Sequence, residues 1–164
     1  MKSQTIIYAG PSLTAQTIQL INTSGFRLLP PIKRTDLTEL VNEKFSGNII
    51  IADGIFQQVL AVGHKEIIKT IEAGSCVYGV SSLGAIRAYE LRHYGMKGFG
   101  KVYSRFLESE DFQDDEVALL HESGPPYRYI SEPLVHFREC IDHLVKEDKI
   151  VTEDGIAIIS HLKG

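Results

Sequence analysis

The sequence predicts an α/β protein with a single doubly wound, mostly parallel sheet, helices on both faces and a helical C-terminal part. Short apolar runs alternate with helical patterns over about the first 94 residues, as right-handed strand–helix–strand crossovers require. Beyond that point the pattern is weaker and mostly helical. The 164 residues contain no internal repeat and no long linker, so we expect one domain over residues 1–164.

Four segments have the short, continuous apolar character of strands buried in a parallel sheet. These segments are Thr5 to Ala9, Phe26 to Leu29, Asn48 to Ala52 and Ser75 to Gly79. Glycine, proline or serine residues follow the strands and terminate them. Cys76 lies in the fourth strand, and its apolar neighbours predict a buried side chain.

Helical spacing of apolar residues follows each strand, and glycine closes most of these helices. In the sheet region the expected helices are Ala15 to Gly25, Thr35 to Gly47, Lys65 to Ala73 and Leu83 to Tyr94. The segment Gly95 to Gly100 has three glycines and is expected to be a loop. In the C-terminal part the expected helices are Asp114 to His121, Pro133 to Lys146 and Thr152 to Leu162.

Composition excludes several functional classes. The net charge of −4 and the pI near 5.9 argue against binding to nucleic acid, which needs a basic face. No apolar run approaches the roughly 20 residues of a membrane-spanning helix, so no membrane contact is expected. With only Cys76 and Cys140 and no visible signal peptide, a cytoplasmic location is the default expectation.

No metal or other cofactor is expected from the motifs. No pair of histidines or cysteines has metal-ligand spacing. The acidic run Asp114-Asp115-Glu116 begins a predicted helix, where carboxylates offset the positive end of the helix dipole. Adjacent helical residues also point in different directions, so these three acids are poorly placed to converge on one ion.

The turns predict one functional site, because ligands of parallel α/β sheets bind beyond the carboxyl ends of the strands. The first strand is followed by Gly10-Pro11-Ser12, the third by Asp53-Gly54 and the fourth by Ser81-Ser82. We call this carboxyl edge of the sheet, with the turns that follow its strands, the rim. His64 and Lys65 begin the helix between the third and fourth strands and are expected near the rim.

Ser82 is the candidate nucleophile at this rim. Val80-Ser81-Ser82-Leu83-Gly84 matches part of the Gly-x-Ser-x-Gly elbow, in which small residues permit a sharp strand-to-helix turn. A serine hydroxyl needs a base, and His64 is the first candidate, with Asp53 orienting it. His121 is the alternative base. The competing interpretation is that Ser81 or Ser82 only caps the helix that follows.

Further residues of the rim are candidates for binding a substrate or an anion through backbone N–H groups or positive charge. They are Gly10, Pro11, Ser12, Lys65, Ser81, Gly84 and Arg87. For Arg87 the alternative is a salt bridge with Glu90, three residues further along the same helix. For Lys65 the alternative is a solvated position at the start of a helix.

Six blocks of this sequence form an ordered series that spans about Thr5 to His121. They are Tyr8-Ala9-Gly10-Pro11-Ser12-Leu13, Asp53-Gly54-Ile55-Phe56, His64-Lys65-Glu66-Ile67, Val77 to Leu91, Gly95 to Gly100, and Asp114 to Ala118 with His121. Taken in this order, the blocks resemble the TfuA-like core domain family. The departures from the family pattern, at Val80, Ser81, Leu83 and Ile86, leave Ser82, Gly84 and Arg87 in place.

The resemblance implies an accessory role beside a YcaO-type enzyme, which uses ATP to activate a backbone amide before sulfur replaces the amide oxygen. The thioamides occur in ribosomally made peptides and in a methanogenesis enzyme, so a precursor peptide or target protein is an indirect partner. The second implied partner is a ubiquitin-like sulfur carrier with a thiocarboxylated end. The implied function is to supply sulfur by hydrolysing that carrier.

On this hypothesis Ser82 attacks the thiocarboxylate carbon, while His64, held by Asp53, takes the proton. N–H groups of Ser82 to Gly84, together with Lys65, stabilise the negative charge. Arg87 binds the terminal carboxylate of the carrier or shapes the pocket. Two alternatives remain open: a non-catalytic adaptor that docks or activates the YcaO enzyme, and a small anion- or nucleotide-binding α/β domain.

Overall fold

The α/β fold is confirmed by a computed structural model, which describes residues 4–55, 60–109 and 112–163. Phe56, part of one matching block, lies outside the described residues. Within the described residues the sheet has five strands, all parallel, in the order β2-β1-β3-β4-β5. The strands are β1 (Thr5–Tyr8), β2 (Arg27–Leu29), β3 (Asn48–Ile51), β4 (Cys76–Gly79) and β5 (Lys97–Gly98).

The short strand β5 was not predicted. It consists of Lys97 and Gly98, inside the segment whose three glycines indicated a loop. A two-residue strand has no apolar pattern of its own, and it forms because Tyr78 and Gly79 of β4 offer their free edge to it. The pairing that defines it is therefore a tertiary effect.

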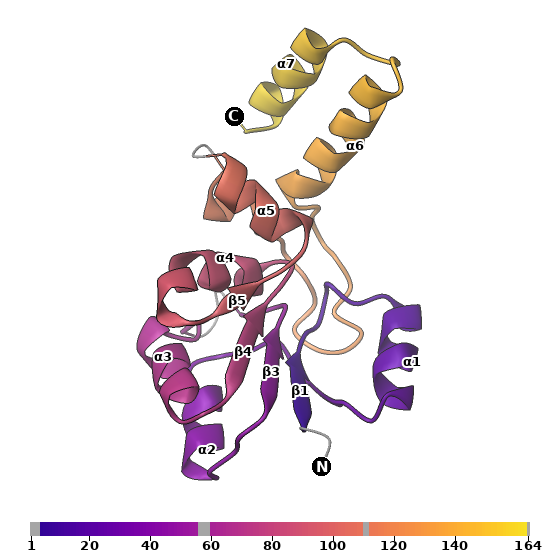
Figure 1. Ribbon diagram of the computed structural model, residues 1–164. Coiled ribbons are helices and arrows are strands. Elements are labelled where there is room, and N and C mark those ends of the chain that lie inside the picture. Colours follow the sequence, from indigo (N-terminus) through magenta and orange to yellow (C-terminus); the bar gives the residue numbers. More distant parts are fainter. Residues whose placement is uncertain (1–3, 56–59, 110–111, 164) are drawn as a thin grey trace.

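Helices cover the two faces of the sheet unequally. On one face, α2 (Asp36–Asn42), α3 (His64–Glu72) and α4 (Leu83–Glu90) pack over a core made by alternate strand residues. On the other face, α1 (Ala15–Thr23) contributes Ile21 to a smaller cluster. Figure 1 shows α1 alone at the β1 side of the sheet, with α2, α3 and α4 grouped on the opposite side.

The main core explains why the apolar runs are strands. Ile6, Ile49, Ile51 and Val77 are almost completely buried and face α2, α3 and α4. Their neighbours in sequence point to the other face, since successive strand residues alternate between faces. Where α1 covers that face both sets of residues are buried, so β1 is buried along its whole length.

The C-terminal part is helical, as predicted, but its first elements differ from the prediction. The helix expected at Asp114 is a single 3₁₀ turn, Asp114–Val117, after which the chain is extended. The helix expected to reach Tyr94 ends as α4 at Glu90, and a 3₁₀ turn, Arg92–Tyr94, follows it. An additional helix, α5 (Lys101–Glu108), packs against α4.

The last two helices form a hairpin that stands beyond α5, away from the sheet (Figure 1). These helices are α6 (Leu134–Lys146) and α7 (Thr152–Lys163). Aromatic and aliphatic side chains join the start of α6 to α4 and α5, among them Phe106, Phe112 and Val135. Within the described ranges, no helix is long and apolar enough to cross a membrane.

A buried carboxylate anchors this hairpin to the body. Glu116 is fully buried, and its two carboxylate oxygens accept hydrogen bonds from Arg138 Nε (2.6 Å) and Nη2 (2.7 Å). Lys163 Nζ at the end of α7 lies 2.9 Å from Oε1. Burial acts to raise the pKa of Glu116, but the hydrogen bonds from Arg138 and Lys163 outweigh it and hold the pKa below its ordinary value.

We predict that Glu116→Gln destabilises the protein by about 3 kcal/mol, because it leaves two cationic groups without their buried counter-charge. The lowered pKa also sets the sign of a pH effect. The native-state charge contributes stability above the ordinary glutamate pKa, and this contribution is lost as the pH falls through the lowered value. Urea denaturation at several acidic pH values measures both effects, and the variant should lose stability less steeply on acidification than the wild type.

Candidate functional site

The predicted site lies where the strand order changes direction. The chain moves from β1 outward to β2, returns to β3 on the other side of β1, and continues to β4 and β5. The carboxyl ends of β1 and β3 therefore flank the position at which doubly wound sheets bind ligands. Gly10 to Ser12 follow β1, and Asp53 follows β3, as the sequence predicted.

Asp53 organises this rim. Its side chain is buried, and Oδ2 accepts hydrogen bonds from the N–H groups of Gly10 (2.8 Å) and Ser12 (2.9 Å). Oδ1 accepts a hydrogen bond of 2.5 Å from the Ser12 hydroxyl. A buried carboxylate with three donors is well satisfied. The N–H groups expected to bind an anion are therefore already occupied by a charge of the protein itself.

The same network reaches the end of β4. Ser12 Oγ lies 2.6 Å from Ser81 Oγ, so a chain of hydrogen bonds runs from Asp53 to the turn before α4. Ser81 has a φ of 60°, a left-handed conformation that is uncommon for serine. This strained residue reverses the chain between strand and helix, and its hydroxyl is held by Ser12.

Two glycines make the sharp turn possible. A Cβ on Gly84 would lie 1.8 Å from the carbonyl oxygen of Ile51, and one on Gly79 would lie 2.0 Å from that of Gly84. Helix α4 therefore starts directly against the sheet. This is the physical requirement behind the small residues of an elbow motif. Gly84 is the second glycine of the predicted elbow motif. Gly79, which lies one residue before the motif, allows the same close approach from the strand.

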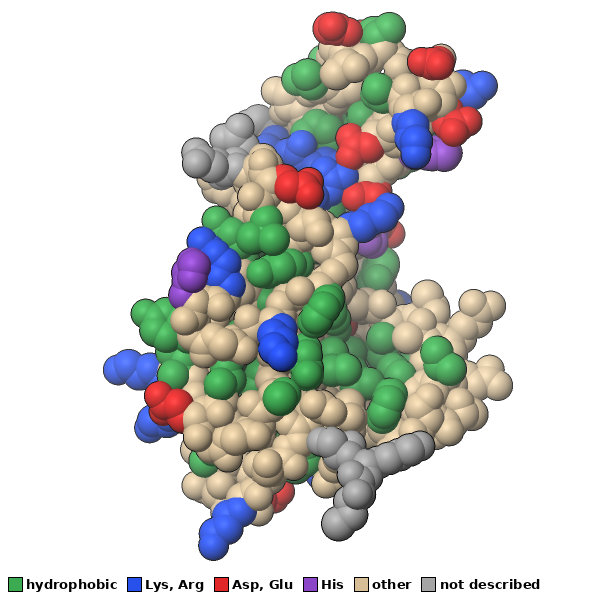
Figure 2. Space-filling view, viewed as in Figure 1, with side chains coloured by type: hydrophobic (Ala, Val, Ile, Leu, Met, Phe, Trp, Pro, Cys, Tyr) green, Lys and Arg blue, Asp and Glu red, His purple; other side chains and the backbone are tan. Residues whose placement is uncertain are grey.

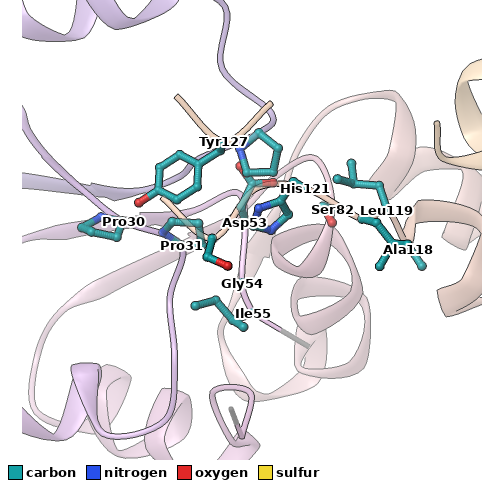
Figure 3. Close-up of a pocket in the computed structure, with 13 residues that line it drawn as sticks. Pro30, Pro31, Asp53, Gly54, Ile55, Ser82, Ala118, Leu119, His121 and Tyr127 are labelled. Carbon is teal, nitrogen blue, oxygen red and sulfur yellow. The ribbon is translucent and has the colours of Figure 1, made fainter. Parts of the chain in front are cut away.

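A cavity of about 340 Å³ opens beside this turn, and Asp53, Ser82 and His121 all contribute to its wall (Figure 3). In the view of Figure 3 the imidazole of His121 lies between the labelled positions of Asp53 and Ser82. The other lining residues are Pro11, Pro30, Pro31, Gly54, Ile55, Ala118, Leu119, Leu120, Ser123 and Tyr127.

Sequence reasoning missed much of this wall, because the segment from Ala118 to Ile130 was read partly as a helix. The segment folds back on itself, with a bridge between His121 and Tyr129 and a hydrogen bond from Ile130 N to Leu120 O. The Tyr129 hydroxyl donates to the Pro11 carbonyl (2.7 Å), which ties the segment to the rim. The run Ser123-Gly124-Pro125-Pro126 predicts a break in the chain, but it does not predict that the segment returns to the rim.

One hydrogen bond defines the tautomer of the His121 ring. Its Nδ1 lies 2.7 Å from the carbonyl oxygen of Glu122, and a carbonyl can only accept, so Nδ1 carries the hydrogen. In the neutral ring Nε2 then has a free lone pair. The ring of Tyr127 meets the imidazole edge to face at 5.8 Å between centroids.

Ser82 is the residue before α4, and its side chain makes no capping hydrogen bond. Its hydroxyl donates to the Val117 carbonyl at 3.4 Å. Among the described residues, neither His64 nor His121 hydrogen-bonds to it. The backbone N–H groups of Ser82 and Leu83 have no hydrogen-bond acceptor among the described residues, whereas the Gly84 N–H donates to the Ala52 carbonyl. The predicted donor set is therefore reduced to two.

The predicted contact between His64 and Asp53 is not formed. His64 Nε2 lies 2.7 Å from Glu90 Oε2, and Arg87 Nη1 lies 2.6 Å from the same oxygen. Arg87 Nε also donates to the Val62 carbonyl. The salt bridge considered for Arg87 is thus present. His64 begins α3 and faces α4, so the fold directs it away from the carboxyl end of β3.

The remaining candidate cation, Lys65, is exposed at the start of α3 and does not line the cavity. Its neighbour Glu66 has a structural role, because its carboxylate accepts hydrogen bonds from Gly63 N–H and Thr35 N–H. The predicted rim is therefore divided. The cavity contains Asp53, Ser82 and His121, and a separate ion-pair cluster contains His64, Arg87 and Glu90.

Comparison with known families agrees with the resemblance in the sequence. A family model described as TfuA-like protein matches residues 53–164, well over half of the chain. The chain belongs to the TfuA-like family. Membership supports a general role as an accessory protein associated with a YcaO enzyme. No curated protein matches the chain.

The family match begins at the carboxylate that organises the site. For this TfuA-like protein we predict that Asp53→Asn costs about 2–3 kcal/mol of unfolding free energy, because an amide NH₂ would face N–H donors that need an acceptor. Urea denaturation measures the loss. The matched control is Asp115→Asn at an exposed position, which should change stability by less than about 0.5 kcal/mol. Equal effects of the two substitutions would contradict the role given to Asp53.

Proposed function

We propose that this TfuA-like protein supplies sulfur to its YcaO partner by hydrolysing the thiocarboxylated end of a ubiquitin-like sulfur carrier. The observation that carries the proposal is the cavity shared by Ser82 and His121. A serine at a strand-to-helix elbow, a histidine with a free Nε2 and unpaired N–H groups at a helix start are the components of acyl transfer.

The reaction proceeds in two steps on this arrangement. Ser82 Oγ attacks the carbon of the thiocarboxylate while His121 Nε2 takes the hydroxyl proton, and the N–H groups of Ser82 and Leu83 stabilise the oxyanion. The C–S bond then breaks, the proton passes to sulfur, and hydrosulfide leaves an ester on Ser82. Water, deprotonated by His121, hydrolyses the ester and returns a carboxylate, a free serine and a proton.

This proposal changes the base and the role of the aspartate from those expected on sequence. His121 replaces His64, because His121 lines the cavity and His64 is paired with Glu90. Asp53 acts as a positioning residue that holds Gly10 and Ser12, and through Ser12 it holds Ser81. Hydrogen bonds between catalytic groups often tighten only with substrate in place, and on this proposal the Ser82–His121 bond forms in that state.

The shape of the cavity favours a slender chain end as the substrate. Its wall includes Pro11, Pro30, Pro31 and Tyr127, which give rigid apolar surfaces with few hydrogen-bonding groups. The flexible tail of a carrier protein can lie along such a surface while its reactive end reaches Ser82. Burial raises the pKa of Tyr127, so its hydroxyl stays protonated and available as a donor at neutral pH.

One observation favours a non-catalytic adaptor as the second candidate. The Ser82 hydroxyl is directed to the Val117 carbonyl, and no histidine activates it among the described residues. On this alternative the rim only docks the carrier or the YcaO enzyme. The third candidate, an anion- or nucleotide-binding domain, is disfavoured because Asp53 already occupies the N–H groups of Gly10 and Ser12.

We predict that Ser82→Ala and His121→Gln each lower sulfide release from a thiocarboxylated carrier by roughly a hundredfold or more. Sulfide is measured with the purified protein in the absence of a YcaO enzyme. The matched controls are Ser104→Ala on α5 and His64→Gln, which should retain most of the activity. Circular dichroism and urea denaturation check that the variants are folded.

The outcomes separate the candidates. No turnover by the wild type without a YcaO enzyme, with carrier binding intact, supports the adaptor. Full activity of Ser82→Ala removes the nucleophile from the proposal. Loss of activity in His64→Gln with normal activity in His121→Gln would return the role of base to His64.

A further inference from the structure

One face of the sheet is covered over only part of its width. Parallel sheets are almost always covered by helices on both faces, because the crossover helices that join parallel strands lie on those faces. Here α2, α3 and α4 cover one face, but on the other face α1 is the only helix among the described residues, and it packs against β2 and the neighbouring β1. Helix α5, which follows the last strand, packs against α4 instead.

The strand register shows where the cover ends. One row of register partners crosses four neighbouring strands: Ile7 of β1 pairs with Ile50 of β3, Ile50 with Tyr78 of β4, and Tyr78 with Lys97 of β5. The side chains of this row therefore point to the same face of the sheet. Ile7 beside α1 is 7% exposed, Ile50 and Tyr78 are partly exposed, and Lys97 is exposed. Exposure therefore increases along the row with distance from α1.

We call this uncovered region the open face and define it as Ile50, Cys76, Tyr78, Lys97 and Phe99. Phe99 is 56% exposed, and its ring lies 6.1 Å from that of Tyr78. Cys76, predicted to be buried, is exposed here because no helix lies over β4 on this side within the described chain. Figure 2 shows hydrophobic side chains gathered over the middle of the molecule, between the positions of α1 and α3 in Figure 1.

Helix α7 carries a stripe of apolar side chains that is exposed. Gly155 and Ile159 pack toward α6, but Ile158 and Leu162 are 43% and 46% exposed on another side of the helix. Asp154 is four residues before Ile158 and lies on the same stripe. The stripe thus combines two large apolar side chains with one carboxylate near the helix start.

The two surfaces are complementary in charge. The open face carries one charged side chain, Lys97, and α1 beside it carries none. The stripe on α7 carries Asp154, with Glu153 next to it in the first turn. An acidic helix start placed near Lys97 would set an ion pair at the border of an otherwise apolar contact.

The chain's own α7 is held away from its open face. The hairpin stands beyond α5 (Figure 1), and Glu116 fixes both of its helices through Arg138 on α6 and Lys163 at the end of α7. Among the described residues no helix is free to cover this face, and a second copy of this chain can supply one.

We propose that two copies of this chain form a closed dimer in which α7 of each copy packs its Ile158–Leu162 stripe on the open face of the other. The contact is reciprocal, so one two-fold arrangement buries both exposed surfaces and leaves no free end for further growth. Asp154 of each copy lies near Lys97 of the other. The dimer is independent of the proposed chemistry at Ser82.

The test is the molar mass of the full chain in solution, measured by sedimentation or light scattering across a concentration series. The wild type is expected to be a dimer. Ile158→Asp on α7 and Phe99→Asp on the open face should each weaken dimerisation by at least roughly tenfold, because a carboxylate would be buried at two equivalent contacts. The matched control is Ile130→Asp at an exposed position outside both surfaces, which should leave the dimer intact.

Charge reversal tests which surfaces meet. Lys97→Glu and Asp154→Lys should each weaken the dimer, and the two changes combined in one chain should restore it, because the ion pair is rebuilt with opposite polarity. A monomeric wild type would overturn the proposal. So would a dimer that is sensitive to Phe99→Asp but not to Ile158→Asp, since the open faces would then meet each other, and so would a double variant no better than the single ones.

Discussion

The site depends on one buried charge, the carboxylate of Asp53. Two N–H groups and one hydroxyl, from Gly10 and Ser12, converge on it. A buried carboxylate is tolerated only when donors replace its lost hydration. The loop after β1 is therefore fixed to the end of β3, and the Ser12 hydroxyl extends the same network to Ser81 at the end of β4. One charge thus sets the relative positions of three strand ends.

The strand-to-helix turn at Ser81 and Ser82 is built from tight packing around this network. Gly79 and Gly84 let α4 begin within contact distance of the sheet backbone, and Ser81 takes the left-handed conformation that this close approach demands. Ser82, the next residue after this turn, lines the cavity. The folded-back segment that contains His121 forms part of the cavity wall, and Tyr129 holds this segment through its hydrogen bond to the Pro11 carbonyl.

Uneven cover of the sheet has a structural cause in the C-terminal half. After β5 the chain could return over the open face, but α5 packs on α4, where Phe106 joins the cluster of Phe112, Val117 and Val135. Glu116 and Arg138 then fix the hairpin to that cluster. Packing of α5 and the hairpin on the α4 side therefore leaves apolar side chains exposed on the face of the sheet that carries α1. The same packing holds α7 away from the sheet, so Ile158 and Leu162 are exposed as well.

The sequence by itself determined the first four strands of the sheet and the residues that follow them at its carboxyl edge. Short apolar runs, their terminating residues and the positions of Gly10, Asp53 and Ser82 follow from local patterns, because periodicity and turn chemistry act over a few neighbours. Only the tertiary structure decided which partners those residues have. Asp53 binds a backbone loop and not His64, His121 enters the cavity, β5 forms by pairing with β4, and Cys76 is exposed. These outcomes depend on how distant segments pack against one another, and no local pattern in the sequence encodes that packing.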